Sequence, residues 1–223
     1  RVAYKAKMVD NQFAEFRNEY MYGVLTEDIL PVEPIHLFHL WFDEARSAGE
    51  SEPTAMSLAT ASKEGRPSVR IVLLKDANQE GFGFFTNFDS RKGEELLENP
   101  NAALLFFWPK TQRQVRIEGL VVRMAEEESD AYFLSRPLGS RIGAIISPQS
   151  KVIPSRVYLE ERYKSEEATY NSGREPDRPH FWGGFRLVPT QIEFWQGREN
   201  RLHDRVVYRS LSPQGWEVLR LAP

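Results

Sequence analysis

The sequence contains no cysteine, which excludes disulfide bonds, thiolate nucleophiles and cysteine-ligated metals. It also lacks a basic excess, because 29 Lys and Arg residues stand against 32 Asp and Glu residues and leave a formal charge of −3. Proteins whose main partner is nucleic acid usually carry a basic excess, so we expect no nucleic-acid partner. No apolar run approaches the ~18 residues that a membrane span requires, so we expect no membrane partner and a cytoplasmic location.

Several signatures of nucleotide-binding proteins, hydrolases and metalloenzymes are absent as well. No G-x-G-x-x-G motif opens a helix after a strand and no P-loop occurs, which argues against a Rossmann-type nucleotide site. No G-x-S-x-G elbow is present. His36 and His39 lie three residues apart, but no carboxylate–histidine pattern completes a zinc site, so we expect no metal centre. A bound anion would therefore be held by side chains and helix ends.

A change of character near residue 30 divides the chain. Residues 1–30 are polar with scattered aromatic side chains, and we expect them to form an N-terminal arm rather than part of the core. Residues 31–223 show no further break and are expected to form a single domain. Because the chain opens at Arg1 rather than Met, we expect a missing upstream segment, which leaves organelle targeting open.

The pattern of residues 31–223 predicts a mainly β fold with peripheral helices. Strands are expected over the ranges 55–61, 69–75, 81–87, 102–108, 114–123, 185–188, 191–195, 205–209 and 216–221. Helices are expected over the ranges 34–48, 90–98, 125–136 and 155–170. The first helix is expected to bury the side chains of Leu37, Leu40, Trp41 and Ala45. Neighbouring strands with few helices between them favour an antiparallel sheet that closes into a barrel with the helices outside.

Two cations fall in the first turn of the helix expected over 90–98. Asp89 or Ser90 can cap this helix, which places Arg91 and Lys92 at its positive end, where the helix dipole disfavours cations. A bound phosphate reverses this argument, because free N–H groups and both cations would converge on it. The alternative is an exposed turn with two solvated bases.

Two further pairs of residues are compatible with anion binding but are less specific. Arg70 and Lys75 flank an apolar run, and a spacing of five places them on opposite faces of a strand, where they would contact different ligands unless the strand end twists. The alternative is two surface bases at strand termini. Tyr132 and Arg136 lie four residues apart on one face of an expected helix, with Ser140 beyond, and such pairs are more often simply exposed.

Another basic cluster lies near the C-terminus. If this segment is extended, Arg201, His203 and Arg205 share one face and form a surface for anion binding and proton transfer. Trp195, a few residues earlier, can stack on a flat ring. The alternative is a salt-bridged strand in which Asp204 neutralises its neighbours.

Taken together, these segments closely resemble the pyridoxine/pyridoxamine 5′-phosphate oxidase family. The resemblance runs from about residue 17 to the end of the chain, and so many motifs in order make chance agreement untenable. The matching stretches are E-P-T-A-M at 52–56, R-I-V-L-L-K at 70–75, F-T-N at 85–87, S-R-K at 90–92, R-Q-V at 113–115, S-R-P at 135–137, I-G-A at 142–144, Q-S at 149–150, F-W-G-G at 181–184, E-F-W-Q-G at 193–197, R-L-H-D-R at 201–205 and R-L-A-P at 220–223.

The resemblance implies an antiparallel split β-barrel of the FMN-binding type, acting as a homodimer with FMN at the subunit interface. The residues that match cofactor positions are Arg70, Ile71, Val72, Leu73, Leu74, Lys75, Phe85, Thr86, Arg91, Lys92, Gln114, Gln149, Ser150, Trp195 and Arg205. The residues that match substrate positions are Arg17, Tyr20, Lys75, Tyr132, Arg136, Ser140, Arg201 and His203. Among these, the segment from Arg17 to Tyr20 resembles an arm that closes over the substrate, and Arg201 and His203 resemble the pair that holds the substrate ring against the flavin.

The implied reaction is the oxidation of pyridoxamine or pyridoxine 5′-phosphate to pyridoxal 5′-phosphate. A hydride passes from C4′ of the substrate to the flavin, O₂ reoxidises the flavin and yields hydrogen peroxide, and the amine substrate also releases ammonia. Two alternatives remain open. Another split-barrel flavin enzyme, such as a flavin reductase or a deazaflavin-dependent oxidase, would lack the R-L-H-D-R stretch. A non-catalytic carrier of FMN or pyridoxal phosphate would have no need of Arg201 and His203.

Overall fold

The computed structural model describes residues 23–27, 30–170, 173 and 175–223. Arg17 and Tyr20 lie outside the described residues, so their placement over the substrate stays a prediction, as does the division of the chain at residue 30. We expected residues 1–30 to form an arm outside the core. Leu25 does not follow this expectation, because its side chain is buried in the hydrophobic core. The Leu25 backbone also donates a hydrogen bond to Asp204 Oδ2 and accepts one from Arg220, which ties it to the C-terminal strands.

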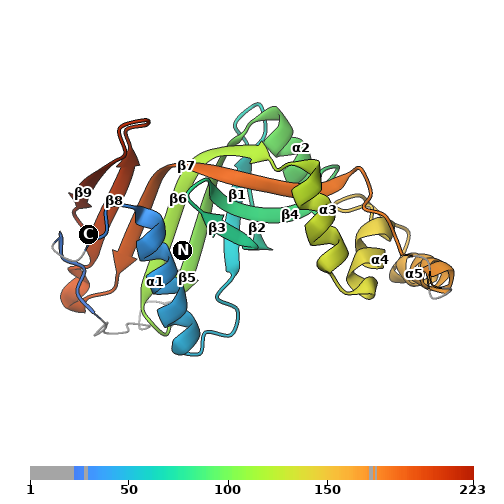
Figure 1. The fold of residues 1–223 in the computed structure, drawn as a ribbon, viewed down its shortest axis with the longest axis horizontal. Coiled ribbons are helices and arrows are strands. Elements are labelled where there is room, and N and C mark those ends of the chain that lie inside the picture. The colour runs from blue at the N-terminus through green and yellow to red at the C-terminus, as the bar shows by residue number, and fades with distance from the viewer. Residues whose placement is uncertain (1–22, 28–29, 171–172, 174) are drawn as a thin grey trace, which may run out of the picture.

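The fold is a single antiparallel sheet with helices around it (Figure 1). The strands are β1 (Ala55–Ala61), β2 (Pro67–Leu73), β3 (Asp76–Asn78), β4 (Gly81–Asn87), β5 (Asn101–Trp108), β6 (Arg113–Arg123), β7 (Trp182–Gln196), β8 (Asp204–Ser210) and β9 (Trp216–Leu221). The helices are α1 (Pro34–Ser47), α2 (Arg91–Glu98), α3 (Glu126–Ser135), α4 (Leu138–Ile146), α5 (Arg156–Tyr170) and the 3-10 turn η2 (Glu199–Arg201). The predicted fold class, mainly β with an antiparallel split barrel and peripheral helices, is therefore confirmed.

Strand β7 organises the sheet because it pairs with three other strands. It runs beside β6 for almost its whole length, with a register shift between Glu118 and Gly119 of β6. Its first part pairs with β4, and its last part pairs with β8, which in turn pairs with β9. Figure 1 shows the result: α3, α4 and α5 gather at one end of the molecule, and β8 and β9 lie at the other. The two segments predicted as separate strands, 185–188 and 191–195, are thus parts of one strand.

Helix α1 closes the core over the curved sheet. Pro34 opens it at a position where a missing N–H costs nothing, and Phe38 packs edge-on against Phe82 with ring centroids 4.9 Å apart. Trp41 makes a similar contact with Phe194 at 5.2 Å. The expectation that Leu40 is buried is wrong, since its side chain is 54% exposed. At 100° per residue it falls roughly 60° outside the arc that the buried side chains occupy.

The sequence patterns missed two short elements, β3 and α4. Strand β3 has only three residues, too few for a period-two pattern to be visible. Helix α4 contains two glycines and follows Pro137, features that are typical of loops, yet it buries Ile142 and Ile146 one turn apart. In the described part of the chain, no helix is long and apolar enough to cross a membrane.

Candidate functional site

A cavity of about 480 Å³, called the basic cavity below, opens at the end of the sheet where α3 and α4 lie. Its size is typical of small-ligand sites. Three cations, Lys75, Lys92 and Arg136, line it, and none of its lining residues in the described part of the chain is a carboxylate. Most wall residues were predicted from the sequence as cofactor or substrate contacts, and the structure brings these together: Ile71, Val72, Leu73, Lys75, Phe85, Thr86, Lys92, Tyr132, Arg136, Ser140 and Gln149.

Lys92 reaches this cavity from the first turn of α2. As expected, Ser90 caps the helix, because its side chain accepts a hydrogen bond from the backbone of the first turn. The Lys92 Nζ donates to Thr86 Oγ1 at 3.0 Å, to Ser90 Oγ at 3.1 Å and to Gln149 Oε1 at 2.6 Å. Within the described residues no carboxylate pairs with it, and burial together with the nearby Arg70 lowers the pKa of Lys92 to about 8. A half-buried ammonium group without a counter-charge favours the binding of an anion.

Aromatic rings form a second wall of the basic cavity. Phe85 stacks on Tyr132 with centroids 4.0 Å apart, and the Trp182 ring lies parallel to Tyr132 at 6.2 Å. The Arg136 guanidinium lies 4.8 Å from the Trp182 centroid, and its Nη1 is buried without a hydrogen-bond partner among the described residues. Burial lowers the pKa of Arg136, although Tyr132 opposes this shift. A buried guanidinium with an unused donor is a second indication that an anionic ligand binds here.

Ion pairs hold α3, the helix that carries Tyr132, against the sheet. The buried Arg178 pairs with Glu126 and, at 2.6 Å, with Asp130. The buried Arg186 of β7 pairs with Glu128 at 3.0 Å. Because three acidic side chains of one helix are fixed by two buried guanidiniums, the helix has a defined orientation, and its cavity-facing side chains are fixed with it.

Seven residues expected to bind the cofactor do not line the basic cavity in this chain. Four of them are Arg70, Leu74, Arg91 and Ser150, and the other three, Gln114, Trp195 and Arg205, lie elsewhere on the sheet. Leu74 is buried in the hydrophobic core, and Ser150 lies in an exposed turn with a φ of 69°. Arg70 and Arg91 both pair with Glu95. The expectation that Arg70 and Lys75 lie on opposite faces of one strand does not apply, because β2 ends at Leu73. Lys75 follows the strand and lines the basic cavity.

A second group of predicted site residues, called the aromatic row below, comprises Gln114, Trp195, His203 and Arg205. It lies on β6, on β7 and around the start of β8. Gln114 pairs in register with Trp195, and Trp195 pairs with Arg205, so the three side chains lie side by side across the sheet. The His203 ring lies 4.6 Å from the Trp195 ring. This group has a flat, partly exposed surface of the kind that can contact a planar ligand.

Arg205 is neutralised within this group, but not by its neighbour in the sequence. Its guanidinium makes a two-pronged contact with the buried Glu193, at 2.9 and 3.1 Å. Asp204 instead pairs with Arg198 at 3.3 Å and with Arg220 at 2.9 Å. The alternative of a salt-bridged strand was therefore right for Arg205, but the acid that pairs with it is Glu193 rather than Asp204. In this chain Arg205 makes a structural ion pair.

The condition for a shared face, an extended segment from Arg201 to Arg205, is not met at Arg201. Residues Glu199–Arg201 form a 3-10 turn, and both Asn200 and Arg201 have positive φ values, 55° and 61°. Such a backbone costs energy in residues other than glycine and is found most often at functional sites. Nδ1 of His203 accepts a hydrogen bond from the Arg198 backbone at 3.0 Å, so the neutral ring carries its proton on Nε2. Burial and the charge of Arg201 lower the pKa of His203, which favours this neutral form.

The basic cavity and the aromatic row lie at opposite ends of β7. Trp182 lines the cavity and Trp195 belongs to the row, thirteen residues further along the strand. At about 3.3 Å per residue, roughly 40 Å of strand separates them, which is longer than a mononucleotide. In one copy of the chain the two groups therefore do not share a cavity.

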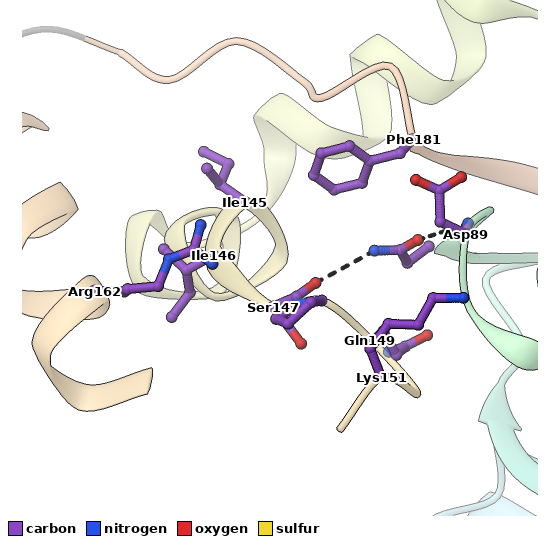
Figure 2. A pocket seen from close by; sticks show the side chains of 10 residues that line it. Asp89, Ile145, Ile146, Ser147, Gln149, Lys151, Arg162 and Phe181 are labelled. Carbon is purple, nitrogen blue, oxygen red and sulfur yellow. Dashed lines mark hydrogen bonds between the residues drawn. The ribbon is translucent and has the colours of Figure 1, made fainter. Parts of the chain in front are cut away.

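A smaller cavity of about 250 Å³ lies beside the basic cavity and shares Gln149 with it (Figure 2). Ile145 and Phe181 contribute apolar walls, and Lys151 and Asp89 bring charges of both signs to its rim. Arg162 adds a second cation to the lining, and Lys151 is already paired with Glu94 on the surface.

Two residues that contact predicted site residues, Trp182 and Glu95, were not themselves predicted from the sequence. Trp182 lines the basic cavity, and the only signal for it was its place in the F-W-G-G stretch. Glu95 holds two of the predicted arginines, and its spacing of four from Arg91 on a helix was the signal available.

Comparisons with known proteins show the family of the chain. A model of the family described as pyridoxamine 5′-phosphate oxidase matches residues 42–169, and a model of the pyridoxine 5′-phosphate oxidase C-terminal dimerisation region matches residues 182–223. A pyridoxine/pyridoxamine 5′-phosphate oxidase of Polynucleobacter asymbioticus is 55% identical and covers 96% of this chain and 100% of its own length. The corresponding oxidase of Bordetella avium is 56% identical and covers 94% and 99%.

Solved structures show the same relationship. PhzG from Burkholderia lata, solved in complex with tetrahydrophenazine-1-carboxylic acid, has a TM-score of 0.85 and 33% identity, and covers 91% of this chain and 99% of its own. An FMN-binding protein related to pyridoxamine 5′-phosphate oxidase from Nostoc punctiforme has a TM-score of 0.67 and 17% identity over 84% and 96%, which shows the fold alone. The chain belongs to the pyridoxine/pyridoxamine 5′-phosphate oxidase family of oxidoreductases.

Proposed function

We propose that this protein oxidises pyridoxamine or pyridoxine 5′-phosphate to pyridoxal 5′-phosphate, with FMN as cofactor and O₂ as oxidant. The observation that carries the proposal is the basic cavity, whose walls, as far as the chain is described, hold three cations and no carboxylate on a chain of net charge −3. Cofactor and substrate each bring a phosphate, so two anions account for cations that would otherwise repel one another.

The residues of the basic cavity fit FMN. Lys92, Thr86 and Gln149 already form a hydrogen-bonded cluster at the start of α2, where a helix terminus and a cation favour a phosphate. The exposed apolar side chains of β2, Ile71 and Leu73, also line this cavity and offer a surface for a flat ring. When bound, the flavin would supply the two-electron chemistry at C4′ of the substrate, with hydrogen peroxide as the product from O₂.

The substrate would occupy the side of the cavity formed by α3 and α4. Tyr132 and Arg136 at the end of α3, Ser140 of α4 and Lys75 after β2 line the cavity together, a set that suits the substrate phosphate. His203 would donate from Nε2 to an acceptor on the pyridine ring, and Arg201 would add a positive charge beside it. Their effect is to hold C4′ in a reactive position, which is a large part of what an enzyme supplies.

A homodimer reconciles the two groups of residues. The match to a dimerisation region covers residues 182–223, which include Trp195, Arg201 and His203. Strand β2 is an edge strand whose Val69 and Ile71 side chains are more than 60% exposed, an arrangement that a second copy would cover. We infer a two-fold symmetric dimer in which the aromatic row of one copy faces the basic cavity of its partner.

The test is an oxygen-electrode assay of the purified, flavin-loaded protein. We expect O₂ consumption only when pyridoxamine or pyridoxine 5′-phosphate is added, with hydrogen peroxide and pyridoxal 5′-phosphate formed in equal amounts. Tetrahydrophenazine-1-carboxylic acid, which lacks a phosphate, is the comparison substrate and should be inactive. Flavin binding without any turnover would identify a carrier, and turnover that requires a reduced nicotinamide would identify a flavin reductase.

A further inference from the structure

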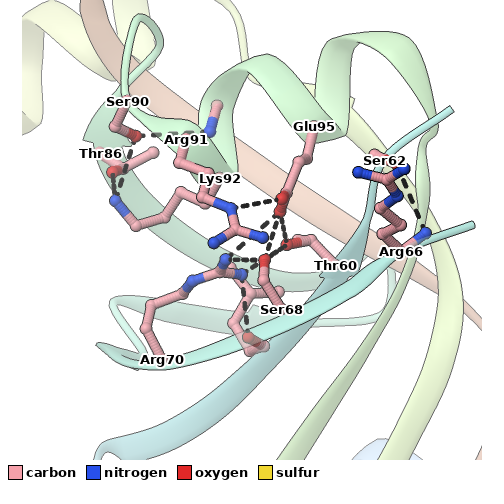
Figure 3. Close-up of polar contacts among 12 residues, drawn as sticks. Thr60, Ser62, Arg66, Ser68, Arg70, Thr86, Ser90, Arg91, Lys92 and Glu95 are labelled. Carbon is pink, nitrogen blue, oxygen red and sulfur yellow. Dashed lines mark hydrogen bonds and ion pairs between the residues drawn. The ribbon is translucent and has the colours of Figure 1, made fainter. Parts of the chain in front are cut away.

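The buried carboxylate of Glu95 connects α2 to the hairpin formed by β1 and β2 (Figure 3). Its side chain is 8% exposed, although it lies on a helix whose other acidic side chains face solvent. Oε1 accepts a hydrogen bond from Arg91 Nε at 2.9 Å. Oε2 accepts from Ser68 Oγ at 2.5 Å, from Thr60 Oγ1, and from Arg70 Nη2 at 3.3 Å.

These contacts make Glu95 a fixed anion. Burial alone raises the pKa of Glu95, but the hydrogen bonds from Ser68, Thr60 and Arg91 outweigh burial and bring the pKa to about 2. A carboxylate that is ionised and held by four donors keeps those donors in place in return. Arg70 is fixed further by Thr60 Oγ1 at 2.5 Å and by the Leu58 carbonyl at 3.1 Å, so its guanidinium has one defined orientation.

The same carboxylate sets the balance of charge at the start of α2. Three cations, Arg70, Arg91 and Lys92, lie close together, and Glu95 pairs with the two arginines but not with the lysine. Figure 3 shows the Lys92 side chain directed away from Glu95, toward Thr86 and Ser90. The carboxylate therefore reduces repulsion among the cations and leaves Lys92 available to a ligand.

Building on the proposed FMN site, we propose that Glu95 is a positioning residue for the cofactor phosphate. It holds Arg70 and Arg91 in fixed positions near Lys92, so that both guanidiniums add to the positive charge at the Lys92 end of the basic cavity although neither lines it. The proposal predicts a change in FMN affinity opposite to the one expected from charge alone. Removing a negative charge near a phosphate should tighten binding if only Coulomb attraction matters, whereas it should weaken binding if the orientation of the arginines matters more.

The experiment compares Glu95→Gln with Glu94→Gln, its matched control. Glu94 is the adjacent acid on the same helix, but it is exposed and pairs with Lys151 on the surface, so its removal changes charge without releasing an arginine. FMN and riboflavin are titrated into apo-protein, with quenching of flavin fluorescence as the signal. Riboflavin lacks the phosphate and therefore reports damage to the rest of the pocket.

We expect Glu95→Gln to raise the Kd for FMN about tenfold or more, while the Kd for riboflavin changes less than about twofold. Glu94→Gln should leave both constants within about twofold. Unchanged or tighter FMN binding by Glu95→Gln would overturn the proposal, and so would an equal loss for both flavins, which indicates a general structural role. If wild-type protein fails to bind FMN at all, the proposed function fails instead.

A milder variant keeps the test usable if Glu95→Gln does not fold. Ser68→Ala removes a hydroxyl that contacts both Glu95 and Arg70 but leaves every charge in place. We expect a severalfold rise in the Kd for FMN, again without a matching change for riboflavin. Wild-type values for both flavins would overturn the proposal.

Discussion

The replacement of Lys92 by glutamine tests whether the first turn of α2 is built for an anion. Lys92 is held by three neutral acceptors and lacks a paired carboxylate among the described residues, so its charge is unbalanced in the apo-protein. A charge-assisted hydrogen bond to a phosphate is worth roughly 1.5–3 kcal/mol. Since ~1.4 kcal/mol is a factor of ten, Lys92→Gln should raise the Kd for FMN about tenfold or more.

The stability of the apo-protein should respond in the opposite direction. The pKa of Lys92 falls from 10.5 to about 8 on folding, mainly because of burial. At ~1.4 kcal/mol per pH unit this corresponds to ~3 kcal/mol, which solvent screening at a half-buried site reduces to ~1–2 kcal/mol. The lost hydrogen bonds offset part of that gain, so Lys92→Gln apo-protein should be as stable as wild type or slightly more stable.

The dependence on pH gives the sharper test. Between about pH 8 and 10.5 the unfolded chain holds the Lys92 proton and the folded chain does not, so apo-protein stability rises with pH in this window. A bound phosphate favours the charged lysine, so wild-type affinity for FMN should fall by up to about tenfold per pH unit above pH 8. The variant should lose both trends.

The assay is FMN titration and thermal melting of apo-protein from pH 7 to 9.5. Lys151→Gln serves as the control, because this exposed lysine lies near the same helix and pairs with Glu94. If Lys92→Gln binds FMN as wild type does, or melts at a clearly lower temperature, Lys92 has a structural role and the phosphate lies elsewhere.

Three further predictions concern the substrate and the partner subunit. Arg136→Gln should raise the KM for the phosphorylated substrate about tenfold or more with FMN still bound, and an unchanged KM would exclude the contact. Arg201→Ala and His203→Ala should lower turnover without loss of FMN, and wild-type activity should decline on the acid side as His203 becomes charged; loss of FMN instead would overturn the assignment. At an FMN concentration too low to load Lys92→Gln, mixing this protein with His203→Ala should bring about a quarter of the sites to wild-type activity, because half of the dimers are hybrids with one intact site. Absence of rescue in a verified hybrid would place both residues in one subunit's site.

The fold was predictable wherever a pattern extends over several residues. Strands β1, β4 and β9 were predicted with their observed bounds, because alternation and turn residues delimit them. The long strand β7 was divided in two, since Pro189 and Thr190 look like a break. The structure has a bulge there, because Gly119 pairs with Pro189 and Glu118 with Gln191, which leaves Thr190 as the extra residue of β7.

The basic cavity was predictable for a different reason from the aromatic row. Its residues lie in short segments with recognisable motifs, and the structure brings them together in one chain. Arg70, Arg91 and Arg205 were harder, because each resembles a free base in the sequence and each pairs with a buried acid in the structure. Only the three-dimensional register reveals that Glu193 reaches Arg205 from the neighbouring strand, twelve residues away.

The same ion pairs explain why basic residues alone are a poor guide to an anion site. A guanidinium beside a buried carboxylate has part of its charge neutralised, and its first function is to hold the fold together. The informative cations are those without such a partner, and among the predicted cofactor and substrate residues of the described chain these include Lys92 and Arg136. Both line one cavity, on walls formed by different helices. Two unbalanced, partly buried charges in one cavity would destabilise an apo-protein that had no anion to bind, and the proposed binding of phosphates in this cavity accounts for both of them.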